Sequence, residues 1–278
     1  MIRIIKSYEE CREFVDSFRN DPNFSDPMLC NEEQVQCNLI KSIENPDSYC
    51  VIGVCSEERI IGLFVFLVIR DEKYLEMLVG LSREGEAYRE MLQYLAQCFP
   101  GYNADFVFNP ANYLLKELLE LHGAEFEPEM YKMVLTNPTP NVDTAGVELL
   151  SPKYTAQYCG IHNNDMYWTG EKVVAATDRF RTLVAICDGK VVGYIDVTYT
   201  HKENEPFDLL VLKEYRRMGY GRKLLAKALE MNRPNGMMLL VEMDNEPAIR
   251  LYESMGFVRA QGENNLTAHW KNITIRNS

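Results

Sequence analysis

The second half of the chain alternates between apolar runs and amphipathic segments, in an order typical of a sheet packed against helices. Two alternating runs flank the dipeptide Asp188-Gly189, which is a strong signal for a β-hairpin. The pattern predicts strands at 183–187, 191–200, 207–212, 237–243, 257–259 and 266–275. Apolar residues at helical spacing predict helices at 222–231 and 246–255, and 151–180 is also expected to be helical. This order predicts a mixed sheet with helices packed on it.

A proline-containing segment, 137–146, interrupts this pattern and divides the chain into nearly equal parts. The two parts are related by a weak repeat. At the offset that places Gly123 on Gly256, Asn112 falls on Asn245, and the buried strand expected at 60–69 falls near the second strand of the hairpin. Both parts are therefore expected to be copies of one fold, with domains at 1–138 and 142–278.

Net charge and apolar content restrict the class of protein. The chain has 278 residues, of which 46% are apolar, and a net charge of −12. The whole acidic excess falls in the first 140 residues, which argues against a nucleic-acid partner or an anionic membrane surface. No apolar run is long enough for a spanning helix.

Cysteine and histidine spacing gives no sign of a metal site. The eight cysteines form no Cys-x-x-Cys pair, and the four histidines share no metal-ligand spacing. No bound metal is expected, and reduced thiols in a cytoplasmic protein are the natural interpretation.

The stretch 209–225 carries the strongest chemical signal. An apolar strand ends, a short loop contains Gly219 and Gly221, and an amphipathic helix begins at once. Backbone N–H groups of such a loop and of the first helical turn converge on one point and favour an anion. The loop lacks the Gly-Lys-Ser/Thr of a Walker loop and the third glycine of the dinucleotide fingerprint. Nearby basic side chains make a pyrophosphate the expected ligand.

Two motifs in this half resemble those of the GNAT acetyltransferase superfamily. Arg216-Arg-Met-Gly-Tyr-Gly221 fits the signature Arg/Gln-x-x-Gly-x-Gly/Ala, and 245–257 is similar to the family's second signature, with Asn, Ala, Leu-Tyr and Gly-Phe in order. The resemblance covers about 142–278. It implies an α/β (α+β) fold of two tandem GNAT-like domains, each a mixed, mostly antiparallel sheet flanked by helices. It also implies acetyl-CoA as co-substrate and direct transfer to an amine.

The resemblance implies which residues contact acetyl-CoA. The strand before the loop is expected to splay from its neighbour, with the pantetheine arm in the gap. Strand backbone groups would bind the arm, loop N–H groups from Arg217 to Arg222 would hold the pyrophosphate, and Asn245 would contact the arm further along. The expected binding residues are Leu210, Val211, Leu212, Arg216, Arg217, Met218, Gly219, Tyr220, Gly221, Arg222, Asn245 and Tyr252.

Acid–base roles are also implied. Tyr252 matches the family's general acid, which protonates the departing thiolate; taken alone, a core tyrosine on the apolar face of its helix is the better interpretation. Asp208 and Glu205 stand at the start of the strand where the family often has an acidic residue, and Asp196 lies on the neighbouring strand. Any of them is a candidate base, and a solvated strand end is the alternative for Asp208.

The first half departs from the family pattern at these positions. In the ungapped register Glu86 replaces Gly219, Tyr88 replaces Gly221 and Leu119 replaces Tyr252. Negative charge would then repel phosphates, and the acid would be missing. We expect a degenerate domain, 1–138, that does not bind acetyl-CoA.

The sequence thus predicts an N-acetyltransferase that acts on a primary amine, with a small molecule as the expected acceptor. The alternative is a non-catalytic acyl-CoA-binding sensor. Neither a nucleic acid nor a membrane is expected as a partner, and a monomer and a homodimer remain equally open.

Overall fold

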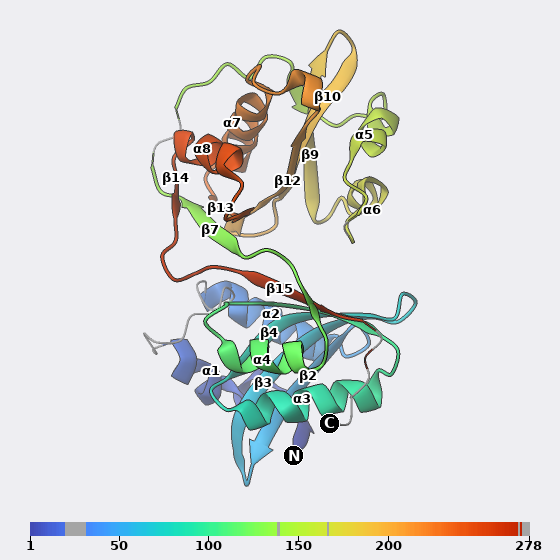
Figure 1. Cartoon of the computed structure of the whole chain (residues 1–278), viewed down its shortest axis with the longest axis vertical. Coiled ribbons are helices and arrows are strands. Elements are labelled where there is room, and N and C mark those ends of the chain that lie inside the picture. The colour runs from blue at the N-terminus through green and yellow to red at the C-terminus, as the bar shows by residue number, and fades with distance from the viewer. Residues whose placement is uncertain (20–31, 138–139, 166, 272, 274–278) are drawn as a thin grey trace. The chain divides into compact units, whose positions relative to one another are not determined.

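The computed structural model describes residues 1–19, 32–137, 140–165, 167–271 and 273. Contacts divide the chain into two compact units, drawn in Figure 1. Unit 1 combines Met1–Met130 with Gln261–Ser278, and unit 2 is Tyr131–Ala260. Each is described by itself.

Unit 1 is built on a seven-stranded sheet with the order β1-β2-β3-β4-β5-β15-β6. Its strands are β1 (Ile2–Ile4), β2 (Tyr49–Ser56), β3 (Arg59–Ile69), β4 (Tyr74–Ser82), β5 (Asn103–Phe108), β6 (Glu125–Phe126) and β15 (Leu266–Trp270). Its helices are the 3₁₀ turn η1 (Tyr8–Glu10), α1 (Arg12–Arg19), α2 (Glu32–Glu44), α3 (Gly85–Cys98) and α4 (Tyr113–Leu121). All neighbouring strands of this sheet pair antiparallel except β4 and β5, which run parallel.

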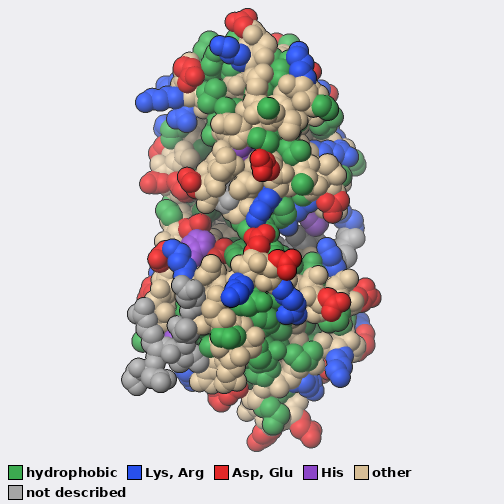
Figure 2. All heavy atoms as spheres, turned by 90° about the vertical axis from the view of Figure 1, so that its right-hand side faces the viewer, with side chains coloured by type: hydrophobic (Ala, Val, Ile, Leu, Met, Phe, Trp, Pro, Cys, Tyr) green, Lys and Arg blue, Asp and Glu red, His purple; other side chains and the backbone are tan. Residues whose placement is uncertain are grey.

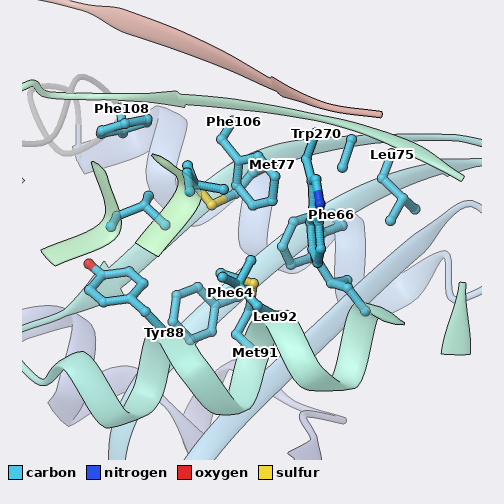
Figure 3. Packing of buried hydrophobic residues seen from close by; sticks show 14 of the residues in the cluster. Phe64, Phe66, Leu75, Met77, Tyr88, Met91, Leu92, Phe106, Phe108 and Trp270 are labelled. Atoms are coloured by element: carbon cyan, nitrogen blue, oxygen red, sulfur yellow. The ribbon is translucent and has the colours of Figure 1, made fainter. Parts of the chain in front are cut away.

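Both faces of this sheet are covered, which explains why β3 is almost wholly apolar. Helices α3 and α4 pack on one face around Phe64, Phe66 and Trp270 (Figure 3). Helix α1 and the described part of α2 pack on the other, around Val15 and Leu39. The buried strand expected at 60–69 is confirmed.

Unit 2 contains two four-stranded sheets, β12-β10-β9-β8 and β11-β13-β7-β14. Its strands are β7 (Met130–Leu135), β8 (Val147–Leu149), β9 (Phe180–Cys187), β10 (Lys190–Thr198), β11 (Glu203–Asn204), β12 (Pro206–Val211), β13 (Gly236–Glu242) and β14 (Phe257–Arg259). Its helices are α5 (Thr155–Ile161), α6 (Gly170–Ala175), the 3₁₀ turn η2 (Lys213–Tyr215), α7 (Tyr220–Asn232) and α8 (Glu246–Ser254).

In unit 2, helices α7 and α8 lie on one side of the strands, and α5 and α6 lie on the other (Figure 1). The expected hairpin is β9–β10, turning at Asp188 and Gly189, which both have positive φ. The region 151–180 forms two short helices joined by irregular chain, because Asn163, Asn164 and Thr169 make local turn and cap bonds there. The remaining elements expected in this half lie within two residues of those predicted, except the last strand, which the structure ends at Trp270.

The last strand of each half is exchanged. Strand β15, expected in the second domain, pairs with β5 and β6 of unit 1, while β7, from the end of the first half, pairs with β14 of unit 2. The units therefore differ from the division at 1–138 and 142–278, because strand pairing and not the proline-containing segment determines where each sheet ends. Residues 138–139 of that segment lie outside the described residues.

The repeat is visible in the helix caps. Asn112 caps α4 by accepting a hydrogen bond from Leu115 N–H at 3.2 Å, and Asn245 caps α8 by accepting one from Ala248 N–H at 3.3 Å. The expected α/β architecture, two related halves each with a mixed, mostly antiparallel sheet flanked by helices, is confirmed.

The surface shows no single dominant charge on the side drawn in Figure 2, where acidic and basic side chains are interspersed over the described residues. Within the described chain, every helix is too short or too polar to cross a bilayer.

Candidate active site

The strands that carry the site diverge. Strand β11 pairs parallel with β13 at Asn204 and Met237, but the following strand, β12, pairs with β10 and lies at the edge of the other sheet. The edge of β12 that faces away from β10 is therefore not used by the ladder. This is the gap that the sequence predicted beside this strand.

The register decides which backbone groups face the gap. Leu212 N–H donates to Val192 O at 2.9 Å, and Leu210 lies opposite Tyr194, so both face β10. Because peptide groups alternate along a strand, Leu209 and Val211 face the gap. Of the three expected backbone partners only Val211 is on this edge; Leu210 and Leu212 are used by the ladder, and Leu209 was missed. The alternation could have identified it once the paired edge was known.

The loop before α7 has the geometry of an anion site. Gly219 has φ +88° and Arg217 φ +66°, and the first helical bond runs from Lys223 N–H to Gly219 O at 3.0 Å. The N–H groups of Tyr220, Gly221 and Arg222 precede that bond and lack an intrahelical acceptor. With the helix dipole they favour a negative charge at this point.

Gly221 keeps this point open. A Cβ there would contact Leu251 Cδ2 at 3.4 Å and the side chains of Val211 and Leu209 at 3.8 and 3.9 Å. Leu251 belongs to α8 and the other two neighbours belong to β12. A Cβ would make ordinary contacts there, but a longer side chain would project between β12 and α8.

Basic groups surround the loop with different partners. Arg216 Nε donates to Val211 O at 2.9 Å, and Lys223 Nζ lies 3.4 Å from Asp143 Oδ2. Arg217, Met218 and Arg222 are exposed. The expected cluster of positive charge around the loop is present.

Asn245 is placed as a helix cap. Its Oδ1 accepts from Ala248 N–H, so the amide oxygen is already used by α8. The equivalent Asn112 makes the same bond in a half that lacks the glycine loop. Its expected contact with the pantetheine arm stays a prediction.

Tyr252 and Asp208 interact electrostatically. Tyr252 lies on α8, 8% exposed, with its ring edge against Phe257. Burial raises the pKa of Tyr252 to about 12, and the negative charge of Asp208 adds to the shift. Tyr252 is thus protonated at neutral pH and under the electrostatic influence of a carboxylate.

Glu205 stands apart from this pair. It is partly buried just before β12, where burial raises its pKa to about 7 and the charges of Arg179 and Lys132 oppose the shift. Asp208 is influenced instead by Tyr194, Asp196 and His162, so the two expected bases occupy different environments.

A buried polar network behind Asp208 escaped the sequence analysis. Strand pairing sets Thr182, Asp196 and Asp208 in one row across β9, β10 and β12, and Phe207 is an extra residue that bulges from this row. His162, at the end of α5, reaches the row with Nε2 3.0 Å from Asp196 Oδ2. No local motif marks these residues, because only long-range pairing brings them together.

Unit 1 has no equivalent loop. Strand β4 ends at Ser82 and α3 begins at Gly85, so only 83–84 separate them, against 212–219 in unit 2. Glu86 therefore lies within the first turn of α3 and not at a loop position as the ungapped register placed it. Glu84 contacts Arg59 at 3.4 Å.

Tyr88 occupies the interior of that half. Its ring packs on Phe64 in the core drawn in Figure 3, with no exposed surface. Its hydroxyl donates to Ser82 O at 3.0 Å and accepts from Asn112 Nδ2 at 2.8 Å. The side chain thus joins the end of β4 to the start of α4, and Leu119 is buried where unit 2 has Tyr252.

Comparison with known proteins agrees with the motifs. The family described as acetyltransferase (GNAT) domain matches residues 178–259. These residues are a GNAT acetyltransferase domain. An N-alpha-acetyltransferase of Sulfurisphaera tokodaii is 33% identical over 90 residues, which are 27% of this chain and 54% of that protein. The chain therefore spans about half the length of this curated relative.

Solved structures extend the likeness to the whole chain. A GCN5-related N-acetyltransferase from Sphaerobacter thermophilus aligns with TM-score 0.65 and 14% identity, covering 98% of this chain and 95% of its own. A tandem GNAT protein from the clavulanic acid biosynthesis pathway aligns with TM-score 0.62 and 14% identity over 100% of both chains. The fold is thus that of tandem GNAT proteins, as the motifs predicted.

Proposed function

We propose that unit 2 is an N-acetyltransferase that transfers the acetyl group of acetyl-CoA directly to the primary amine of a small molecule. The observation that carries the proposal is the unpaired edge of β12, which leads into the glycine loop before α7. The candidate base Asp208 lies on β12 and the candidate acid Tyr252 lies on α8, the two elements whose side chains surround Gly221. The proposal takes its family from the match at residues 178–259.

The residues present fit acetyl-CoA. The N–H groups of Tyr220, Gly221 and Arg222 would hold the pyrophosphate, with Arg217 and Arg222 adding charge. The backbone of Leu209 and Val211 would pair with the pantetheine arm. When bound, acetyl-CoA supplies a thioester whose carbonyl carbon accepts the amine.

The proton transfers follow from the two side chains. Asp208 takes a proton from the acceptor's ammonium group, which frees the nitrogen lone pair for attack on the thioester carbon. As the carbon–sulfur bond breaks, Tyr252 donates its hydroxyl proton to the sulfur. Exchange with water then returns a proton to Tyr252 and removes one from Asp208. A pKa of about 12 keeps Tyr252 in its donating form across the neutral range.

Asp208 is favoured over Glu205 as the base. Asp208 contributes to the electrostatic environment of Tyr252, and its side chain is 18% exposed, so an acceptor can reach it. Glu205 remains the second candidate, because its pKa of about 7 suits a base.

The proposed acceptor class rests on the chemistry of the candidate site and on the names of two similar proteins. A carboxylate base beside an open edge suits a protonated small amine, and one solved relative belongs to a biosynthetic pathway. The printed name of the curated relative favours peptide N-termini instead. A small amine is the acceptor that we propose. We further propose a cytoplasmic protein, either a monomer or a homodimer, that has neither a nucleic acid nor a membrane as partner.

Calorimetric titration of acetyl-CoA into wild type, Gly219→Glu and Gly189→Glu tests the binding part. Both glycines have positive φ and open space around their Cβ positions, so the two variants carry the same backbone strain. We expect one site per chain, lost in Gly219→Glu and kept in Gly189→Glu. Two sites per chain, or equal loss in both variants, would contradict the proposal.

Thiol release in the presence of amines, amino sugars, amino acids and short peptides tests the reaction. Turnover with a small amine supports the proposal, whereas turnover restricted to peptides transfers the acceptor role to N-termini. Binding without turnover for any acceptor would favour the second candidate, an acyl-CoA sensor. For such a sensor, Tyr252→Phe would leave acetyl-CoA binding unchanged, and neither wild type nor the variant would turn over.

A further inference from the structure

The network behind Asp208 is closed to solvent except at one end. The side chains of His162 and Asp196 are 1% and 0% exposed, whereas that of Asp208 is 18% exposed. His162 Nε2 lies 3.0 Å from Asp196 Oδ2 and 3.9 Å from Asp208 Oδ2. The histidine thus stands between two carboxylates, and only Asp208 faces the site.

The hydrogen bonds of His162 define its charge. Nδ1 lies 2.8 Å from the carbonyl oxygen of Asn163, which can only accept. Nε2 contacts Asp196, whose oxygens also receive the hydroxyls of Tyr158 at 2.9 and 3.0 Å and Thr182 at 2.5 Å. With Nδ1 facing a carbonyl oxygen and Nε2 facing a carboxylate, both ring nitrogens of His162 face acceptors, and a ring that donates through both nitrogens is an imidazolium.

Tyr194 connects this cation to Asp208. Its ring stacks on His162 with centroids 4.9 Å apart and planes 12° from parallel. Its hydroxyl accepts from Asn163 N–H at 3.1 Å, so its own proton is directed to Asp208 Oδ2, 2.7 Å away. The orientation of Asp208 therefore depends on a hydroxyl that His162 and its neighbour hold in place.

We infer that His162, fixed as an imidazolium by Asp196, is the positioning residue that aims Asp208 at the acceptor amine and holds it ionised. The inference rests on the proposed function, since it concerns the base of that reaction. His162 contacts no reacting atom and keeps both of its protons throughout. The proton that leaves the acceptor resides on Asp208.

The charges that face Asp208 have opposed effects on its pKa. Burial raises it most and the charge of Asp196, on β10, raises it further, while the hydroxyl of Tyr194 and the charge of His162 lower it. Tyr252 approaches from α8 as a neutral phenol. The pKa of His162 is lowered by burial but raised more by Asp196, Asn163 O and Asp208, which agrees with the geometry.

A divalent cation is the alternative occupant, because one ligand atom from each of His162, Asp196 and Asp208 lies within 4.8 Å of the others. A metal would need the Nε2 lone pair, whereas the imidazolium inferred above carries a proton on Nε2, directed at Asp196 3.0 Å away. The two states differ in the proton on Nε2, which is measurable.

Nitrogen NMR of the wild-type chain, labelled with ¹⁵N-histidine, tests the protonation state. The four histidines can be assigned by replacing His122, His201 and His269 one at a time, so His162 itself stays intact. At pH 8 we expect both ring nitrogens of His162 to be protonated, and the spectrum to be unchanged by EDTA or added Zn²⁺. An unprotonated ring nitrogen, or a Zn²⁺-induced shift at His162, would overturn the inference.

Kinetics of His162→Gln against His201→Gln test the positioning role, because His201 is exposed in the same unit. Loss of the cation raises the pKa of Asp208, so the acidic limb of kcat/KM should move up by roughly one pH unit. We also expect kcat to fall at neutral pH while the Kd of acetyl-CoA stays unchanged. His201→Gln should match wild type.

A wild-type pH profile in His162→Gln would overturn the inference even if the melting temperature fell. If that variant does not fold, Tyr194→Phe removes the hydroxyl that orients Asp208 and should move the acidic limb in the same direction. An unchanged limb in Tyr194→Phe then refutes the inference. Failure of wild type to bind acetyl-CoA refutes the proposed function instead, and leaves the NMR result standing.

Discussion

In the ungapped register Tyr88 of unit 1 falls on Gly221 of unit 2, although the loops before α3 and α7 differ in length. The tyrosine hydroxyl joins Ser82 O to Asn112 Nδ2, the cap of α4, whereas the glycine places only hydrogen against Leu251 of α8 and the side chains of β12. A buried tyrosine side chain thus stands in one half where the repeat has a glycine in the other. Tyr88 belongs to the core of unit 1, where its ring packs on Phe64.

Importing the tyrosine should close the gap beside β12. We expect Gly221→Tyr to weaken acetyl-CoA binding at least tenfold, about 1.4 kcal/mol, because the ring would occupy the space lined by Val211, Leu209 and Leu251. Calorimetric titration measures the loss. Gly160→Tyr is the control, since that helical glycine has open space around its Cβ position. Equal affinities in the two variants would show that the gap is not the binding groove.

Removing the Tyr252 hydroxyl should slow turnover without affecting binding. We expect Tyr252→Phe to lower kcat by roughly 100-fold, the usual contribution of a positioned general acid, with the acetyl-CoA Kd unchanged. Tyr131→Phe makes the same change in a side chain of the same hydrophobic cluster and should keep the wild-type rate. A loss of affinity in Tyr252→Phe would instead mark the hydroxyl as a binding group.

The two candidate bases are separable by substitution. We expect Asp208→Asn to lower kcat by roughly 100-fold or more and to abolish the acidic limb of the pH profile. Glu205→Gln should keep most of the activity. The reverse pattern, with an acidic limb near pH 7 that disappears in Glu205→Gln, would assign the base to Glu205.

Glu205 should instead affect stability. Burial raises its pKa to about 7, above the value in an unfolded chain, so the native state is favoured when the group is protonated. Stability is full below about pH 4.5 and is lost as pH rises through 7. We expect Glu205→Gln to melt a few degrees above wild type at pH 8 and equally with it at pH 4.5. Equal melting at pH 8 would contradict this.

His269 ties the exchanged strand into unit 1. Its Nδ1 lies 2.6 Å from Asp105 Oδ1 and its Nε2 lies 3.0 Å from Glu127 Oε1. The hydrogen bond to Asp105 makes the largest contribution and the one to Glu127 the next, and they raise the pKa of His269 to about 10. Since the folded pKa exceeds the unfolded one, the stabilisation is full below about pH 6.5 and is lost as pH rises through 10.

Replacing this histidine should therefore destabilise the protein in a pH-dependent manner. We expect His269→Gln to lower the free energy of unfolding by about 2 kcal/mol at pH 6, with the deficit much smaller above pH 10. Denaturant titration measures it, and His201→Gln in unit 2 should match wild type. A deficit that does not change with pH would mean that packing, not charge, is what His269 contributes.

The local sequence pattern was sufficient to predict most helices and strands and the glycine loop before α7. Asp188-Gly189, the Asn245 cap and the glycines at 219 and 221 each act on a few neighbouring residues, so the sequence predicts them directly. The exchange of β7 and β15 could not be predicted, because an alternating strand such as Leu266–Trp270 satisfies either sheet equally well. Its partner is chosen by side chains far along the chain, such as Asp105 for His269.

The residues of the candidate site also fall into those that the sequence predicts and those that it does not. The glycine loop and Tyr252 lie in motifs, and Asp208 was a candidate from its place at the start of a strand. His162 lies in a segment without a motif, and its contacts with Asp196 and Asp208 come from two strands that follow it. The backbone partners Leu210 and Leu212 were assigned to the wrong edge, because the sequence does not reveal which side of β12 meets β10.

The order of the units along the chain has a consequence for synthesis on the ribosome. Unit 2 is continuous, Tyr131–Ala260, and all of its strands emerge before translation ends. Unit 1, although most of it is made first, lacks the strand between β5 and β6 until Leu266–Trp270 emerges. The unit translated first is thus completed last, and a nascent chain that has emerged only as far as residue 260 carries a complete unit 2 and an incomplete sheet in unit 1.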